Sequence, residues 1–241
     1  ESSGYAPLRG AIQRRYGVGE GCFELFNGAS AGIFSLFSFL SPDVVSLYAP
    51  IYAEYKKISE MLEAKTVISN RLDGELKIPT KDSVAVFVNP STPDGTLYDV
   101  SGFLDEWCSV SSAVIIDESF LDFTDGVSVL GEVEKYKNLY VVKSMTKYYG
   151  AAGVRVGFVA SKRQNIELLA AREPLWKLSS FDAWYLSGAL KDATFDTRSK
   201  AENTANILQI DRARGKRPPT PVARSKPDQH PELPRRRTER H

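Results

Sequence analysis

A lysine, an arginine and three glycines occur close together in residues 144–157 of this chain of 241 residues. Lys147 follows an apolar run at 139–142 that is typical of a buried strand, and Arg155 comes eight residues after it. A lysine amine at the end of a strand can form a Schiff base with an aldehyde, and an arginine can clamp a phosphate dianion. Most lone lysines are solvated surface charges, but the strand before Lys147 and the arginine after it favour a chemical role.

An aldehyde and a phosphate together describe one cofactor, pyridoxal 5'-phosphate (PLP). Residues 144–157 resemble the lysine signature of class I/II aminotransferases, Ser-x-[Ser/Thr]-Lys followed by Gly-x-x-Gly-x-Arg-x-Gly. The resemblance implies that Lys147 carries the cofactor and acts as a catalytic base. It also implies that Ser144 and Arg155 hold the phosphate.

Asp117 ends another apolar run, at 113–117, where a carboxylate is costly unless a cation accompanies it. Taken alone, Asp117 suits a helix N-cap or a turn equally well. With Lys147 some thirty residues further on, the resemblance implies that Asp117 keeps the pyridinium nitrogen protonated and is catalytic. The family has a tyrosine where this chain has Phe120. The pattern around this phenylalanine is similar to that of threonine-phosphate decarboxylases.

Three weaker signals complete the predicted cofactor site. The small residues at 27–32 precede an apolar helix, so Ala29 and Ser30 are candidates for phosphate contacts at its N-terminus. Tyr52 follows a predicted strand, and the resemblance implies that its ring stacks on the pyridine. Thr92 stands where the family has an asparagine that donates to the cofactor's phenolic oxygen. Each signal also has a plain structural interpretation, namely a turn for the first and last and a core tyrosine for Tyr52.

Alternating strand and helix patterns predict an α/β protein with a doubly wound, mostly parallel sheet and helices on both faces. Expected strands cover 44–49, 66–69, 83–89, 113–117, 139–143 and 154–160. Expected helices cover 31–40, 52–64, 103–110, 165–171 and 181–190, with the fourth capped by Ser161. The second of these helices is expected to bury one apolar stripe of Tyr55, Ile58, Met61 and Leu62. The family resemblance, over about residues 5–200, implies the aspartate aminotransferase fold. In such sheets ligands bind at the carboxyl ends of the strands.

Composition divides the chain into an acidic body and a basic tail. Residues 211–241 hold ten Lys and Arg against four Asp and Glu, together with six of the thirteen prolines, which favours disorder. We expect a PLP-binding large domain at 1–203, incomplete at its N-terminus, and a basic tail at 204–241 in place of the family's small C-terminal domain. A nucleic-acid arm is a less favoured interpretation, because the tail lacks interleaved aromatic residues.

The remaining composition narrows the function classes. No run of eighteen apolar residues predicts a membrane span, and no signal peptide is visible. Cys22 and Cys108 are far apart and lack a metal-ligand spacing, so we expect both to be reduced and buried in a cytoplasmic protein. No metal site is expected, because both histidines lie near the C-terminus.

The expected function is amino transfer between an amino acid, or a phosphorylated amino compound, and a 2-oxo acid. Within the family, the motifs are similar to histidinol-phosphate aminotransferases. The resemblance also implies a homodimer, without nucleic-acid or membrane partners. Two alternatives stay open: a decarboxylase of the threonine-phosphate type, and an incomplete chain that binds PLP without turnover.

Overall fold

The computed structural model describes residues 5–74, 76–92 and 94–213. Its contacts divide the chain into two units, of which the first ends at Ala193 and the second begins at Thr194. The described part of the second unit is one helix, α7 (Phe195–Ala213). This helix includes residues 203 and 204, between which the sequence predicts a domain boundary. The boundary itself stays a prediction. The basic segment after 213 lies outside the described residues.

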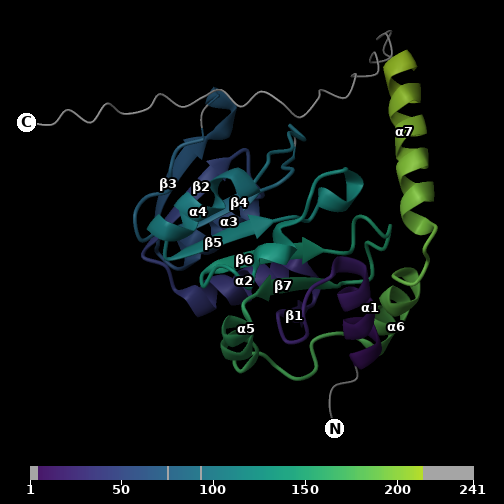
Figure 1. Ribbon diagram of the computed structural model, residues 1–241, viewed down its shortest axis with the longest axis horizontal. Coiled ribbons are helices and arrows are strands. Elements are labelled where there is room, and N and C mark those ends of the chain that lie inside the picture. Colours follow the sequence, from purple (N-terminus) through teal and green to yellow (C-terminus); the bar gives the residue numbers. More distant parts are fainter. Residues whose placement is uncertain (1–4, 75, 93, 214–241) are drawn as a thin grey trace, which may run out of the picture. The chain divides into compact units, whose positions relative to one another are not determined.

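The first unit is built on a seven-stranded sheet with the order β1-β7-β6-β5-β4-β2-β3 (Figure 1). Strands β6, β5, β4, β2 and β3 are parallel, whereas β7 is antiparallel to both β6 and β1. The mostly parallel sheet predicted from the sequence is therefore confirmed. The strands are β1 (Phe23–Phe26), β2 (Val44–Ala49), β3 (Lys65–Asn70), β4 (Val84–Val88), β5 (Ala113–Asp117), β6 (Leu139–Ser144) and β7 (Gly157–Ser161).

Helices cover both faces of this sheet, as predicted. Helices α2, α3 and α5 contribute to one continuous core with alternate residues of the strands. On the other face, Trp107 of α4 stacks on Tyr48 of β2 at 4.4 Å between ring centroids and lies edge-on to Phe87 of β4. The helices of the first unit are α1 (Ala6–Tyr16), α2 (Gly28–Leu40), α3 (Ala53–Met61), α4 (Ser101–Val110), α5 (Arg163–Ala170) and α6 (Ser180–Ala189).

Two strand predictions need correction. The strand expected at 154–160 begins only at Gly157, because Val154 closes a turn by donating its N–H to the Ala151 carbonyl at 2.9 Å. Strand β1 has no counterpart among the predictions, since Glu24 interrupts its apolar pattern. Glu24 is buried because Arg9 and Lys177 both pair with it, at 2.6 and 2.5 Å.

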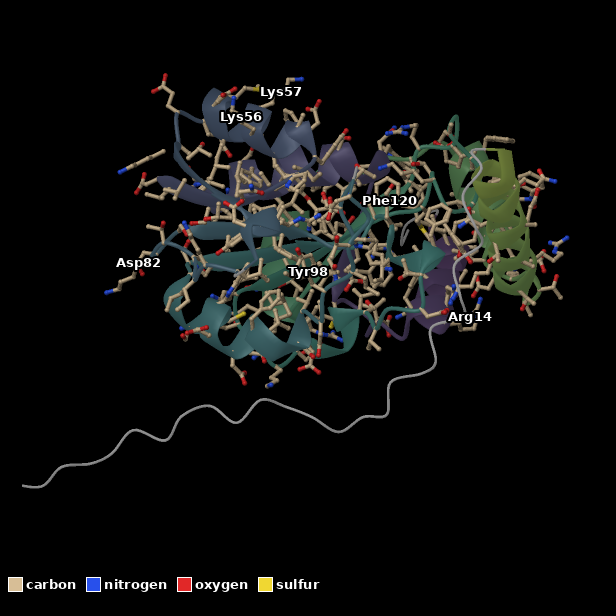
Figure 2. The ribbon with its side chains drawn as sticks, turned by 90° about the horizontal axis from the view of Figure 1, so that it is seen from above. Arg14, Lys56, Lys57, Asp82, Tyr98 and Phe120 are labelled. Carbon is tan, nitrogen blue, oxygen red and sulfur yellow. The ribbon has the colours of Figure 1, made fainter. Side chains whose placement is uncertain are left out.

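Two helix predictions also need correction. Ser161 does not cap α5: it is the last residue of β7, and its hydroxyl donates to the Leu139 carbonyl at 2.6 Å. Lys162 takes the N-cap position instead. Met61, expected on the buried stripe of α3, is 62% exposed because the helix ends there. The exposed side of the same helix carries Lys56 and Lys57, which point outward in Figure 2.

Candidate active site

The candidate site lies at the carboxyl edge of the sheet. Strands β2, β4, β5 and β6 run in the same direction, so the residues at or just after their ends meet at this edge. Strand β7 runs the opposite way, so the segment that leads into it also reaches this edge. One cavity of about 270 Å³ is lined by all eight predicted site residues, Ala29, Ser30, Tyr52, Thr92, Asp117, Ser144, Lys147 and Arg155.

Asp117 forms the acidic part of the cavity. Only 2% of the residue is exposed, and both of its carboxylate oxygens accept hydrogen bonds. The Tyr55 hydroxyl donates to Oδ2 at 2.7 Å, and the Ser119 N–H donates to Oδ1 at 2.9 Å. Burial, followed by the nearby Asp117 charge, raises the pKa of Tyr55 well above its usual value, so this hydroxyl stays a donor. Two donors therefore fix the orientation of a carboxylate that lines the cavity.

Lys147 brings an amine to the same cavity from the loop after β6. Its Nζ lies 3.9 Å from the centroid of the Phe120 ring and 5.7 Å from that of Tyr52. Loss of water lowers the pKa of Lys147; the Asp117 charge opposes this shift and the Arg155 charge adds to it. The side chain still keeps an exposed part, so a molecule that enters the cavity can reach the amine.

The first turn of α2 and Arg155 form a cationic part of the cavity. Asn27 precedes the helix without capping it through its side chain, and the first turn contains no acidic residue. Such a turn favours an anion, because its N–H groups and the helix dipole are unopposed. Arg155 forms no ion pair or hydrogen bond within the described residues.

Two glycines make this close approach possible. A Cβ on Gly157 would lie 2.6 Å from the Ala29 backbone nitrogen and 2.8 Å from the Lys143 carbonyl oxygen. A Cβ on Gly28, whose φ is +77°, would lie 2.6 Å from Nη2 of Arg155. The atoms that oppose Gly157 are backbone atoms, which have little room to move, whereas Gly28 is opposed by the flexible end of the Arg155 side chain. The glycines therefore let the start of α2, the end of β6 and Arg155 converge on one point.

Hydroxyl groups line the remaining wall. Ser144 and Thr146 share a hydrogen bond at 3.1 Å, and Ser30 shares one with the Tyr52 hydroxyl at 3.2 Å. Thr92 follows β4 and is exposed at the cavity. Its neighbour Ser91 fixes this loop by donating to the Pro50 carbonyl at 2.7 Å.

Sequence reasoning missed three residues of the site. Thr146 lies inside the motif that identifies Lys147, so the motif could have predicted Thr146 as a lining residue. Tyr55 was expected only as an apolar contact of α3, because nothing in the sequence pairs its hydroxyl with Asp117. Ser119 acts through its backbone N–H, for which no side-chain signal exists.

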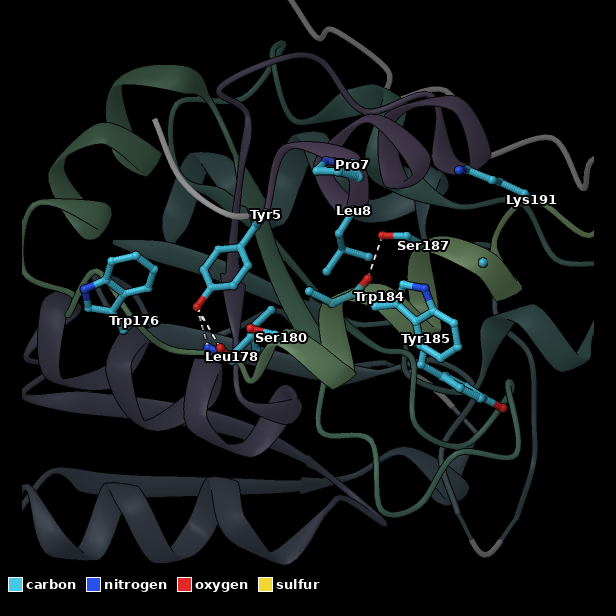
Figure 3. Close-up of a pocket in the computed structure, with 12 residues that line it drawn as sticks. Tyr5, Pro7, Leu8, Trp176, Leu178, Ser180, Trp184, Tyr185, Ser187 and Lys191 are labelled. Atoms are coloured by element: carbon cyan, nitrogen blue, oxygen red, sulfur yellow. Dashed lines mark hydrogen bonds between the residues drawn. The ribbon is translucent and has the colours of Figure 1, made fainter. Parts of the chain in front are cut away.

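A second cavity, of about 450 Å³, lies between α1, α6 and the segment around Leu178 (Figure 3). Tyr5 is fixed at its edge, because its hydroxyl donates to the Leu178 carbonyl at 2.9 Å and accepts from the Leu178 N–H at 2.8 Å. Its lining is mainly apolar and aromatic, with Lys191 as the charged member. No predicted site residue lines it, and the Asp117 carboxylate, the Lys147 amine and the Arg155 guanidinium all belong to the smaller cavity.

The sheet and the cavity thus define a doubly wound α/β domain that brings an amine, a buried carboxylate and a guanidinium together at its strand ends. Residues 20–214 match the family model described as aminotransferase class I and II. The chain belongs to this family.

Individual relatives agree with this assignment. A histidinol-phosphate aminotransferase from Christiangramia forsetii is 28% identical over 138 residues, which cover 54% of this chain and 39% of that protein. An L-serine phosphate decarboxylase from Campylobacter jejuni is 29% identical over 133 residues, covering 52% of this chain and 34% of its own length. The crystal structure of an L-threonine-O-3-phosphate decarboxylase from Porphyromonas gingivalis superimposes with a TM-score of 0.75 at 22% identity, over 86% of this chain and 64% of that one.

The matches with the two sequence relatives span less than half of each relative's length, and the structural match spans 64% of that chain. Within the described residues, each helix is too short or too polar to cross a lipid bilayer.

Proposed function

We propose that residues 1–203 form the PLP-binding large domain of an aminotransferase. The observation that carries this proposal is the single cavity in which the Lys147 amine, the buried Asp117 carboxylate and the Arg155 guanidinium all take part. These groups suit PLP because its aldehyde, its ring nitrogen and its phosphate require an amine, a carboxylate and an anion site. The close packing of α2, β6 and Arg155 that Gly28 and Gly157 allow supports the fit, because it brings the cationic groups together.

When bound, PLP supplies an aldehyde that bonds to an amine and a protonated ring that draws electrons from the bond being broken. Lys147 would hold the cofactor covalently and then, once released by the substrate amine, act as the general base at the substrate α-carbon. Its lowered pKa favours the neutral amine, which both tasks require. Asp117, oriented by its hydrogen bonds from Tyr55 and Ser119, would keep the ring nitrogen protonated.

The other predicted residues would bind and orient the cofactor. Arg155, Ser144 and the first turn of α2, at Ala29 and Ser30, would hold the phosphate. Tyr52 would stack on the ring, a contact worth about 0.5–1.5 kcal/mol beyond burial of its surface. Thr92 would donate to the phenolic oxygen in place of the family's asparagine.

The reaction that these groups support is amino transfer between an amino acid, or a phosphorylated amino compound, and a 2-oxo acid. A direct test incubates the PLP-loaded protein with single amino acids and, separately, with the phosphorylated amino compound histidinol phosphate, and follows the shift of the bound cofactor's absorbance as it gains the amino group. Formation of the matching oxo product supports the proposal. Binding of PLP without any such half-reaction identifies the alternative of an inactive PLP-binding chain.

Phe120 favours a second candidate, a PLP-dependent decarboxylase. The centroid of its ring lies 3.9 Å from Nζ of Lys147, and the ring brings no hydroxyl to the cavity. The pattern around this phenylalanine is similar to that of threonine-phosphate decarboxylases. An L-serine phosphate decarboxylase is among the sequence relatives, and an L-threonine-O-3-phosphate decarboxylase is among the structural neighbours. Release of carbon dioxide from phosphoserine or phosphothreonine, without an oxo product, would establish this activity instead.

We also propose a cytoplasmic homodimer. The family resemblance supports the dimer, and the two buried, unpaired cysteines Cys22 and Cys108 are compatible with a reducing compartment. Light scattering of the purified protein measures the assembly directly.

A further inference from the structure

A buried charged cluster lies behind the candidate site. Successive side chains of a strand point to opposite faces of the sheet, so Lys143 lies on the face opposite Ser144. Only 1% of Lys143 is exposed. Its Nζ pairs with Glu118 at 3.4 Å and with Asp122 at 2.9 Å, and lies 5.0 Å from the centroid of the Tyr16 ring.

The Glu118 branch of the cluster ties the ends of β5 and β6 together. Glu118 directly follows Asp117, and its N–H donates to the Val142 carbonyl at 2.9 Å, beyond the last paired residues of the two strands. The ion pair with Lys143 continues this connection one residue further along β6. Glu118 itself is fixed by the Val129 N–H at 2.7 Å. Burial raises the pKa of Glu118, and the Lys143 charge opposes that shift.

The Asp122 branch holds the turn that carries Phe120. Asp122 belongs to a short 3-10 helix, Leu121–Phe123, that begins directly after Phe120. One of its oxygens accepts from Lys143 and the other from the Tyr16 hydroxyl at 2.8 Å. The turn is thereby attached both to β6 and to α1. Phe120, on the cavity side of this turn, lies against the Lys147 amine.

We propose that Lys143 is a positioning residue, whose two buried ion pairs set the places of Asp117 and Phe120 relative to Ser144 and Lys147. Lys143 does not itself line the cavity, so it acts only through its neighbours. The inference rests on the proposed function, because it concerns how the PLP site is held. A buried ammonium between two carboxylates fits this task, since removing it leaves two carboxylates in a dry site without their cation.

The test compares Lys143→Met, which keeps the length of the side chain but removes its charge, with Lys143→Arg, whose fork can bind both carboxylates. PLP affinity is measured by fluorescence titration, and the orientation of bound PLP by circular dichroism in the cofactor's absorbance band. Lys143→Met is expected to weaken PLP binding about tenfold or more and to reduce the dichroic band. Lys143→Arg is expected to restore both. Lys56→Met, the same change on the exposed side of α3, serves as the matched control.

A second measurement needs no cofactor. In the ligand-free protein, Lys143→Met is expected to speed hydrogen exchange at the Ser119 amide and in residues 121–124, while Lys56→Met leaves these amides unchanged. If Lys143→Met does not fold, Asp122→Asn, which keeps the shape of the side chain, replaces it with the same expected direction of change.

The outcomes separate the two proposals. A folded Lys143→Met variant with wild-type PLP affinity, dichroism and exchange would overturn the positioning role. A wild-type protein that binds no PLP would overturn the proposed function instead, and hydrogen exchange would then decide the role of Lys143 alone.

Discussion

Lys147 and Asp117 line one cavity without forming an ion pair. Asp117 is satisfied by Tyr55 and Ser119, whereas the Lys147 amine lies against the Phe120 ring. A carboxylate whose hydrogen-bond donors are already in place and an amine with a lowered pKa are each free to act on a third molecule. This separation is the feature at the residue scale on which the proposed chemistry depends.

The first prediction concerns the covalent bond between Lys147 and PLP. Lys147→Ala is expected to abolish the visible absorbance of the PLP-loaded protein, because no other amine is placed at the cavity among the described residues. Borohydride reduction followed by peptide mass spectrometry locates the bond in the wild-type protein. Lys56→Ala is the control and should leave the labelling unchanged. Labelling of any lysine other than Lys147 would contradict the assignment.

The second prediction concerns the pKa of Lys147 in the ligand-free protein. The Arg155 cation lowers this pKa and the Asp117 carboxylate raises it. Arg155→Gln is therefore expected to raise the pKa, so that the amine becomes neutral at higher pH. Asp117→Asn is expected to lower it further. The measurement is the pH dependence of Lys147 acetylation, followed by mass spectrometry; shifts in the same direction for both variants would refute the electrostatic account.

At the scale of the elements, strand β7 is what brings Arg155 to the site. Because β7 is antiparallel to β6, the segment before it arrives at the carboxyl edge, beside the first turn of α2. Gly157 allows that turn to lie against the backbone of β6 and β7. The cationic part of the cavity is therefore a product of packing between α2 and β7.

The third prediction tests this packing with Gly157→Ala. The new Cβ would meet backbone atoms on both sides, which cannot move independently, so we expect a loss of about 1–3 kcal/mol in the free energy of unfolding. The phosphate site should open at the same time and weaken PLP binding. Urea unfolding and a PLP titration measure the two effects.

Gly102→Ala is the matched control for that experiment. Gly102 lies in α4 with nothing within 4 Å of an added Cβ, so its substitution should be neutral or stabilising by up to about 1 kcal/mol. A Gly157→Ala protein as stable as the Gly102→Ala protein would show that the close approach of α2 and β7 is not required.

At the scale of the whole molecule, ligand binding and folding are linked. A ligand that binds only the folded state at about 100 times its Kd adds about 2.7 kcal/mol to stability. For a domain of this size, that corresponds to a rise of about 5–10 °C in Tm. We expect PLP to produce such a shift in this chain, measured by differential scanning fluorimetry.

Pyridoxal, which lacks the phosphate, is the control for this fourth prediction. It should shift Tm much less at the same concentration, because Arg155 and the first turn of α2 would have no anion to bind. Equal shifts with PLP and pyridoxal would show that the anion site contributes nothing to binding.

The chain by itself determined the chemical groups and most of the elements that carry them. The strand predicted at 113–117 and the lysine motif after 139–143 could be read locally, because apolar runs and the residues at their ends are adjacent in sequence. The mostly parallel sheet followed from the alternation of such runs with helical patterns. These features depend on neighbours a few residues apart.

Only the tertiary structure decided how those groups meet. The direction of β7, the existence of β1 around the buried Glu24, and the hydrogen bond from Tyr55 to Asp117 all depend on contacts between distant segments. Lys143 illustrates the same limit, since its ion pairs join residues some twenty positions apart on different elements. The sequence specifies which side chains are available, but the packing of distant segments decides which of them pair. Burial requires such pairing, because an unpaired charge in the interior strongly destabilises the fold.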